Sequence, residues 1–335
     1  MTRFFLLPVT VSVIILFGIW AGLGFAAFVT AVLLVILEIT LSFDNAVVNA
    51  RVLSGMNEKW RNRFLTWGIL IAVFGTRLVL PILIVSASVL MSPWAVTMLA
   101  AFNPSEYAHL LEGARYSIYS FGAAFLLMVS LKYFLNDAKD VHWFQVVERH
   151  LARWGRIEAI EIGIALSLIA IISFFVPAVA QATVLMSGLL GVLLFILTQG
   201  ITSALSVEVE GGAVAKSGLA LFLYLEVLDA AFSLDSVIGA FALTTSLPII
   251  IAGLGIGAWF VRSITIYLVQ RKTLETLTYL EHGAHWAILG LAGSMFADLL
   301  FPVPEVVTGT IGLAFILAAY WSSLRARKNL LAATT

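Results

Sequence analysis

Two stretches of this chain repeat one pattern of acidic and hydroxyl side chains inside otherwise apolar sequence. In residues 37–47 and 228–238, a carboxylate is followed by a serine four residues later and by an aspartate at the sixth position. The repeated residues are Glu38, Ser42 and Asp44 in the first stretch, and Asp229, Ser233 and Asp235 in the second. An acidic residue at the centre of a membrane helix costs about 2.5–3.5 kcal/mol, and such residues usually face an interior pathway. The repeat therefore predicts a buried site for positive charge.

The side chains of these stretches offer hard oxygen atoms, which suit Mg²⁺, Ca²⁺ and Mn²⁺ better than soft metals. The predicted metal-binding residues are Glu38, Asp44, Asn45, Asp229, Asp235 and Ser236. The predicted supporting residues are Ser42, Ser233, Glu226, Asn49, Arg77 and Arg262. If the five acids of this set are ionised, the two arginines leave a formal charge of −3. Because unpaired buried charge is neutralised by protons or cations, one divalent cation and one proton would balance it.

The composition indicates which elements must position these residues. Of 335 residues, 61% are hydrophobic and 11% are charged, and the mean hydropathy is +1.04. Soluble domains carry about 25% charged residues, so the fold class expected here is an all-α polytopic membrane protein. The formal net charge is zero, which predicts no nucleic-acid partner, and the chain has no cysteine.

Apolar runs of about 20 residues predict about ten transmembrane helices. The predicted spans are 4–22, 26–53, 64–90, 117–135, 159–178, 183–206, 217–242, 247–270, 280–300 and 304–323. With this count, sixteen of the nineteen Lys and Arg residues fall on one side of the membrane, one falls on the other and two lie inside spans. Since cytoplasmic loops carry excess positive charge, both termini are expected in the cytoplasm, with the first span retained. The expected location is the bacterial inner membrane.

The acidic helices 26–53 and 217–242 are the second and seventh predicted spans, so they cross the membrane in opposite directions. This predicts two five-helix halves of inverted topology, residues 1–180 and 181–335, with a binding site near the midplane where they meet. We expect Glu38 and Asp229 near mid-depth, with Asp44 and Asp235 stepped toward opposite sides. The polar stretch 136–158 is expected to form an amphipathic helix on the cytoplasmic membrane face.

The motifs resemble those of the TerC family of membrane proteins, which is named for tellurium resistance and grouped with the LysE superfamily. The matching residues are Glu38 with Ser42-Phe43-Asp44-Asn45, Glu226 with Asp229, Phe232 and Asp235-Ser236-Val237, and the arginines Arg77 and Arg262. The first span and the loop around Trp143 extend beyond the family's common core, which suggests a divergent branch. The resemblance implies export of Mn²⁺, or else Ca²⁺, from the cytoplasm by alternating access, with membrane lipids and the cation as partners.

Other functions use the same residues. Two aspartates on separate helices are typical of intramembrane aspartyl proteases, whose carboxylates share a proton. Those proteases have a Gly-x-Gly-Asp context that both stretches lack here, so we expect no enzyme and no bound cofactor apart from the transported cation. An exporter of a cationic organic solute such as an amino acid would use the carboxylates to bind an ammonium group. A non-transporting membrane assembly factor, or acids that only hold helices together, are the remaining alternatives.

Overall fold

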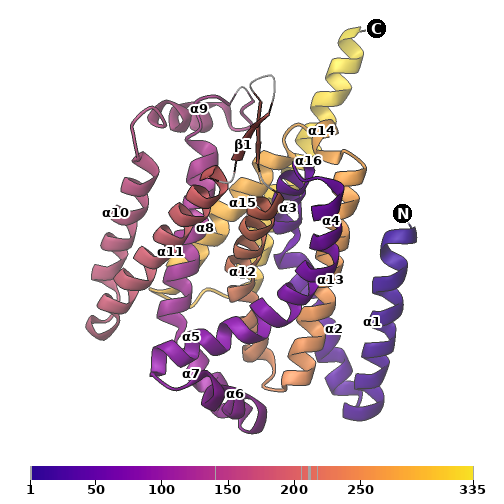
Figure 1. Ribbon diagram of the computed structural model, residues 1–335, viewed down its shortest axis with the longest axis vertical. Coiled ribbons are helices and arrows are strands. Elements are labelled where there is room, and N and C mark those ends of the chain that lie inside the picture. Colours follow the sequence, from indigo (N-terminus) through magenta and orange to yellow (C-terminus); the bar gives the residue numbers. More distant parts are fainter. Residues whose placement is uncertain (1, 140, 205, 210–212, 217, 335) are drawn as a thin grey trace.

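The computed structural model describes residues 2–139, 141–204, 206–209, 213–216 and 218–334. Its architecture is a bundle of helices that run along one common direction, with shorter helices across both ends (Figure 1). The first part of the chain forms α1 (Thr2–Leu23), α2 (Phe25–Leu41), α3 (Phe43–Ser54), α4 (Glu58–Arg63), η1 (Phe64–Gly68), η2 (Ile71–Val79), α5 (Leu80–Val89), α6 (Pro93–Phe102) and α7 (Pro104–Gly113). It continues with α8 (Arg115–Phe134), α9 (Gln145–Trp154), α10 (Ile160–Phe175) and α11 (Ala178–Ala204).

A short antiparallel hairpin, β1 (Ser206–Val209) with β2 (Ala213–Lys216), separates α11 from the remaining helices, and Ser206 pairs with Lys216. The sequence predicted helices alone. The remaining helices are α12 (Gly218–Leu243), α13 (Leu247–Gln270), α14 (Thr273–Thr276), α15 (Leu280–Asp298) and α16 (Glu305–Thr334). Residue 217, where the predicted acidic helix 217–242 begins, lies outside the described residues. The predicted span 247–270 coincides with α13.

The apolar helices make this a membrane-embedded protein. Within the described residues, six helices are long and apolar enough to cross a membrane, or seven if the bent pair α2–α3 counts as one span. Three predicted spans, those that correspond to α10, α12 and α15, fall outside this set for reasons of length or composition; α15 carries Glu281, His282, His285 and Asp298. Every 18-residue stretch of α12 contains Glu226, Asp229 and Asp235, and α10 has only 16 residues. The prediction of a helical membrane protein is confirmed at this level.

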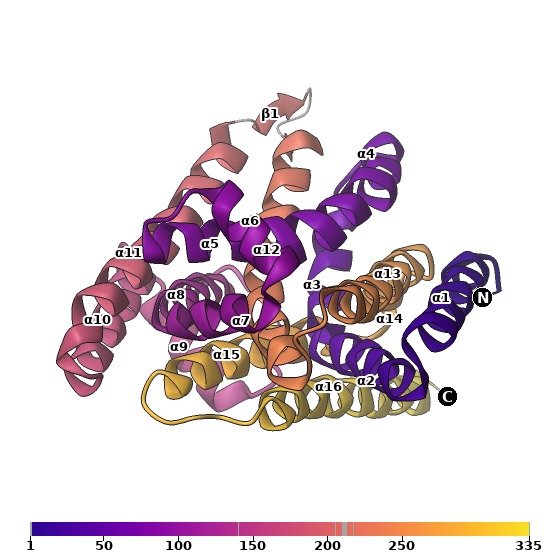
Figure 2. The same cartoon turned by 90° about the horizontal axis from the view of Figure 1, so that it is seen from below.

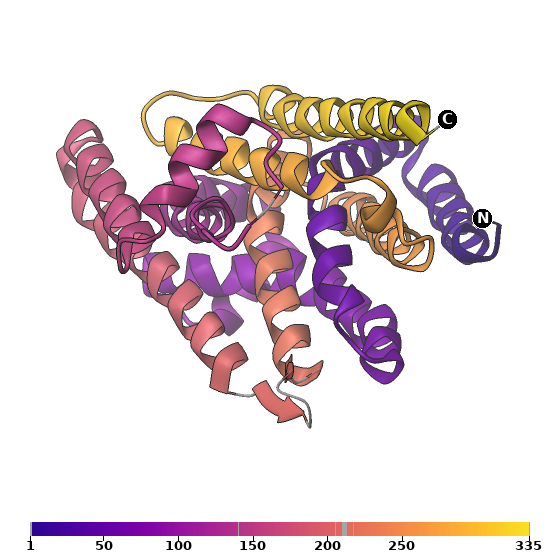
Figure 3. The same cartoon turned by 90° about the horizontal axis from the view of Figure 1, so that it is seen from above.

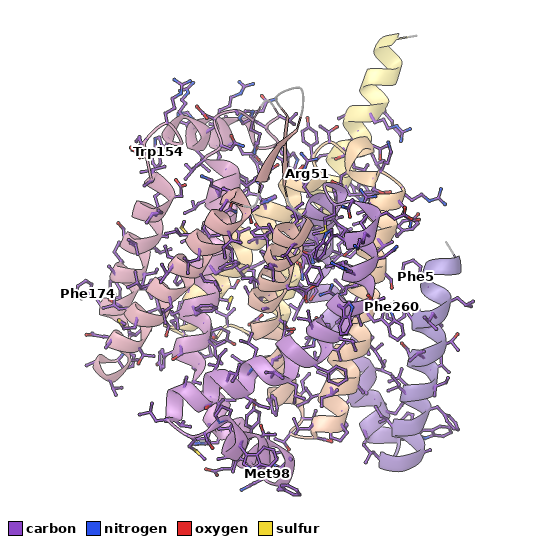
Figure 4. All side chains as sticks on the ribbon, viewed as in Figure 1. Phe5, Arg51, Met98, Trp154, Phe174 and Phe260 are labelled. Carbon is purple, nitrogen blue, oxygen red and sulfur yellow. The ribbon has the colours of Figure 1, made fainter. Side chains whose placement is uncertain are left out.

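The interior of the bundle is formed by α8 and α13, of which 78% and 72% of the membrane-length segment is buried. The corresponding share for α1 is 17%, and α1 lies at the edge of the molecule when the bundle is viewed from below or above (Figures 2 and 3). Exposed apolar side chains such as Phe174 point outward from the bundle (Figure 4), as a lipid environment requires. Acidic and basic residues of the predicted site therefore sit among helices shielded from solvent.

The predicted helix 26–53 is divided in two. Helix α2 ends at Leu41, α3 begins at Phe43, and their axes are bent by 51° at Ser42. Neither Gly nor Pro marks this position in the sequence, so periodicity alone predicts one helix. The predicted span 64–90 also differs, because residues 64–68 and 71–79 have the wider turns of a π-helix. π-Helical turns are rare and occur frequently at functional sites.

Candidate functional site

The bend at Ser42 places an acid on each side of it. Glu38 lies in the last turn of α2 and is fully buried, and the Ser42 hydroxyl donates a hydrogen bond of 3.0 Å to its Oε1 atom. Asp44 lies in the first turn of α3, where the backbone N–H of Asn45 donates to its Oδ1 atom at 2.8 Å. Unpaired N–H groups and the helix dipole favour a negative charge at a helix N-terminus. The break therefore gives Asp44 a backbone environment that Glu38 lacks.

Glu38 forms an ion pair with Arg77, and both side chains are buried. Arg77 lies in η2, where its Nη1 atom also donates to the backbone carbonyl of Ala72, five residues earlier, at 2.6 Å. Gly257 on α13 allows α2 to approach closely, because a Cβ atom there would lie 2.5 Å from Glu38 Cβ. The first acid of the first motif is thus neutralised within the protein.

Arg262 on α13 forms ion pairs with the acids of the second motif. Its Nη2 atom lies 3.2 Å from Glu226 Oε2 and 3.2 Å from Asp229 Oδ2, and its guanidinium carbon lies 4.1 Å from the centre of the Phe64 ring. A Cβ atom at Gly68 would approach Arg262 Nη1 to 2.5 Å, so only glycine leaves room for the guanidinium. One arginine therefore balances one of two buried acids in this cluster.

A hydrogen bond between side chains joins the two motif helices directly. Asn45 Nδ2 on α3 donates to Asp229 Oδ1 on α12 at 2.8 Å. This bond aligns the helices at residues 44–45, and it brings Asp44 to the level of the second motif. The spacing in the sequence predicts Asp44 and Asp235 stepped toward opposite sides, with Glu38 and Asp229 between them. In the structure, Asp44 and Asp235 line the same small cavity, and the hydrogen bond between the two motifs runs from Asn45 to Asp229.

Asp44 and Asp235 line the same small cavity, which also contains the side chains of Ser236 and Thr308. The cavity volume is about 10 Å³, room for about one water molecule. Both acids are more than nine-tenths buried, and Asp235 Oδ2 has no hydrogen-bond partner among the described residues. Among the described residues, no Lys, Arg or His nitrogen lies within 4.0 Å of a carboxylate oxygen of Asp44 or Asp235. Glu38, Glu226 and Asp229, by contrast, each form an ion pair with an arginine.

Not all of the predicted site residues line this cavity. Of the six predicted metal-binding residues, Asp44, Asp235 and Ser236 line it, whereas Glu38, Asn45 and Asp229 are engaged by other side chains. Asn49 Oδ1, Asn45 Oδ1 and Ser233 Oγ are buried with no hydrogen-bond partner in the described part of the chain. No group of three or more His, Asp or Glu side chains that could hold a metal ion occurs among the residues described.

Sequence reasoning missed the contribution of α16 to the cavity. Thr308 and Gly312 lie one turn apart near the start of that helix, and Gly312 faces Asp44 Oδ2. A threonine and a glycine in an apolar run give no signal of a polar site, so only the packing of α16 against α2, α3 and α15 reveals them. Asp298, which is not among the predicted site residues, is also buried and pairs with Arg115 at 2.8 Å.

The fold and the site define a polytopic helical membrane protein with a buried layer of acids, of which some are paired with arginine and two face a shared cavity. The chain belongs to the family described as protein of unknown function (DUF475), whose family model matches residues 43–330. The match includes α3, α12 and both arginines, and it begins after Glu38. No curated protein and no solved structure matches the chain.

Proposed function

We propose that this protein is a membrane transporter that exports a divalent metal cation, with Mn²⁺ as the favoured ion and Ca²⁺ as the next. The observation that carries the proposal is the cavity between Asp44 and Asp235, the two motif acids with no basic partner in the described residues. Two desolvated carboxylates that line one cavity are stabilised by a proton or by a cation bound there. A divalent cation supplies two charges at that point.

The cavity also supports a small, hard ion as the substrate. Its polar groups are two carboxylates and the hydroxyls of Ser236 and Thr308, all of them oxygen ligands. Since only two of these groups are acidic, backbone carbonyls or water would complete the coordination of the ion. A volume of about 10 Å³ is far below that of an amino acid, which disfavours a cationic organic solute in this conformation.

The proposed architecture has about ten membrane passes in two halves of inverted topology, residues 1–180 and 181–335, which exchange access to the site. The pairing of acids supports it, because the first acid of each motif pairs with the arginine of the helical segment that follows, Glu38 with Arg77 and Asp229 with Arg262. The resemblance of the motifs to the TerC family supports the same reading. We place the protein in the bacterial inner membrane with both termini in the cytoplasm, on the distribution of Lys and Arg.

Flux through the purified protein in liposomes tests the proposal. Parent protein should move Mn²⁺, and Asp44→Asn and Asp235→Asn should each lower the rate by at least about tenfold, because each removes one ligand charge. Glu112→Gln is a matched control, since Glu112 is an exposed acid paired with Arg115, and it should transport like the parent. Equal Mn²⁺ flux through parent and both aspartate variants would refute the proposal.

Two further results would each favour a different function. Transport of lysine that Mn²⁺ inhibits in the same liposomes would favour the organic-solute exporter. Loss of cellular function in the Asp44→Asn strain, with neither metal flux nor cellular metal content changed, would favour the assembly factor.

A further inference from the structure

Helix α9 lies across one end of the bundle, over α8 and beside α15 (Figures 1 and 3). The sequence predicted an amphipathic helix in this region that rests on the membrane face through its apolar side chains. The structure adds a buried acid on the opposite side of that helix. The Glu148 side chain is fully buried, whereas the Val146 side chain is 76% exposed and Trp154 points away from the bundle (Figure 4). Helix α9 is therefore attached to the protein through an acid.

Glu148 has an unusually complete set of hydrogen-bond donors. Its Oε2 atom lies 2.9 Å from His282 Nδ1 and accepts from Lys139 Nζ at 3.2 Å and from the Trp143 backbone N–H at 3.1 Å. Its Oε1 atom accepts from Trp286 Nε1 at 3.0 Å and from the Phe144 backbone N–H at 3.3 Å. A carboxylate has about four lone-pair sites, so these contacts satisfy both oxygens. Such an anchor holds α9 in one position.

The charge of this anchor is fixed by its surroundings. Burial alone would raise the pKa of Glu148, but its hydrogen bonds with His282 and Trp286 and the nearby charge of Lys139 hold that pKa well below its usual value. Glu148 therefore remains ionised near neutral pH. The neighbouring ion pair of Arg51 with Glu281, 3.3 Å apart, lies at the same end of the bundle. Removal of the carboxylate would leave buried donors without an acceptor, which is costly.

Two of these contacts lead from α9 to the cavity along a single helix. His282 and Trp286 are one turn apart on α15, and the residues that follow, Ala287 and Leu291, line the cavity with Asp44 and Asp235. A rigid helix carries a shift at one turn to the next, so the position of α15 at the cavity depends on its attachment at His282 and Trp286.

We propose that Glu148 is a positioning residue, which fixes α15 against the Asp44–Asp235 cavity by clamping α9 to His282 and Trp286. The inference rests on the proposed function for the cavity, but the clamp itself can be tested without it. Loss of the carboxylate should loosen α9 first, and it should then lower the affinity of the cavity for a divalent cation.

The absence of cysteine from the chain makes a direct test of the clamp possible. Ala152, on the buried face of α9, is 8% exposed, so Ala152→Cys introduces one protected thiol into the full-length protein. In that background, Glu148→Gln should raise the labelling rate with a polar maleimide by at least about tenfold, as expected for loss of a charged hydrogen-bond acceptor. Glu161→Gln is the control, because Glu161 at the same end pairs with the exposed Lys132. It should not change the rate.

The second readout is equilibrium binding of Mn²⁺ to the same proteins without the cysteine. Glu148→Gln should raise the dissociation constant by about twofold to thirtyfold, the range for residues that act through a neighbouring element, with the number of sites per folded molecule unchanged. A merely structural role would lower the number of sites and leave the dissociation constant as in the parent.

Each outcome decides one step. Equal labelling of the Glu148→Gln and parent backgrounds would overturn the clamp. Faster labelling with an unchanged dissociation constant would confirm the clamp and overturn the positioning role. If the parent binds no Mn²⁺, the proposed function fails, while the labelling result still decides whether Glu148 holds α9.

Discussion

The buried layer of this protein contains two kinds of acid that differ in their partners and not in their burial. Glu38 and Asp229, the first acids of the two motifs, each face an arginine. Asp44 and Asp235, the second acids, line one small cavity, and within the described residues neither forms an ion pair with a basic side chain. The four acids lie on three helices, α2, α3 and α12. Each motif therefore combines one acid that is paired with arginine and one that is not, and the proposed function assigns the second to the cation.

This difference predicts opposite responses to substitution. Where an ion pair is buried, removal of one partner leaves an uncompensated charge, and the cost is large. Where a buried acid has no basic partner, its replacement by a neutral side chain of the same shape leaves no charge uncompensated. Stability in the absence of metal and affinity for metal should thus separate the two kinds of acid.

The largest effect is expected at Arg262, which serves two acids at once. Arg262→Met should lower the free energy of unfolding by about 3–5 kcal/mol, because Glu226 and Asp229 then remain buried without a positive partner. Thermal unfolding in detergent measures the change. Arg51→Met is the control, since the Arg51 side chain is 61% exposed and such ion pairs contribute little. Equal melting temperatures for Arg262→Met and Arg51→Met would contradict the distinction between acids with and without an arginine partner.

A double-mutant cycle at Glu38 and Arg77 sharpens the comparison. Arg77→Met and Glu38→Gln should each destabilise the protein, by about 3–5 kcal/mol for the arginine. The double variant should be more stable than Arg77→Met alone, because it removes the unpaired charge. If the two single effects simply add, the pair is not coupled and Glu38 does not belong with the neutralised acids.

The smallest effect is expected at Thr308, which offers a neutral ligand to the cavity. Thr308→Val keeps the shape of the side chain but removes the hydroxyl, and it should weaken Mn²⁺ binding by about fivefold, which corresponds to one lost contact of about 1 kcal/mol. Thr30→Val is a suitable control, because the Thr30 hydroxyl bonds the Ala26 carbonyl within its own helix. A stronger loss at Thr30 than at Thr308 would argue against a ligand role for α16.

The sequence predicts much of this arrangement because acids and arginines are conspicuous in apolar helices. The repeat of Glu38 and Asp44 in Asp229 and Asp235, and the roles expected of Arg77 and Arg262, could be read from spacing alone. The relative position of α3 and α12 could not, because the hydrogen bond from Asn45 to Asp229 joins residues 184 positions apart.

Local backbone geometry is the second feature that the sequence does not predict. The bend at Ser42 has no Gly or Pro to mark it, and the π-helical turns that carry Arg77 retain the apolar composition of an ordinary membrane helix. Glu148 lies in a polar stretch where a solvated acid is the usual expectation, and its contacts His282 and Trp286 are more than 130 residues away. These features follow from tertiary packing rather than from periodicity.

The most direct test of the central claim is calorimetric titration of Mn²⁺ into the purified protein and into three variants. The parent should bind, the Asp44→Asn/Asp235→Asn double variant should fold with undiminished thermal stability and show no binding, and each single variant should fall between them. Binding by the double variant with the affinity of the parent would contradict the account, because the cation would then not depend on the two motif acids that lack a basic partner in the described residues.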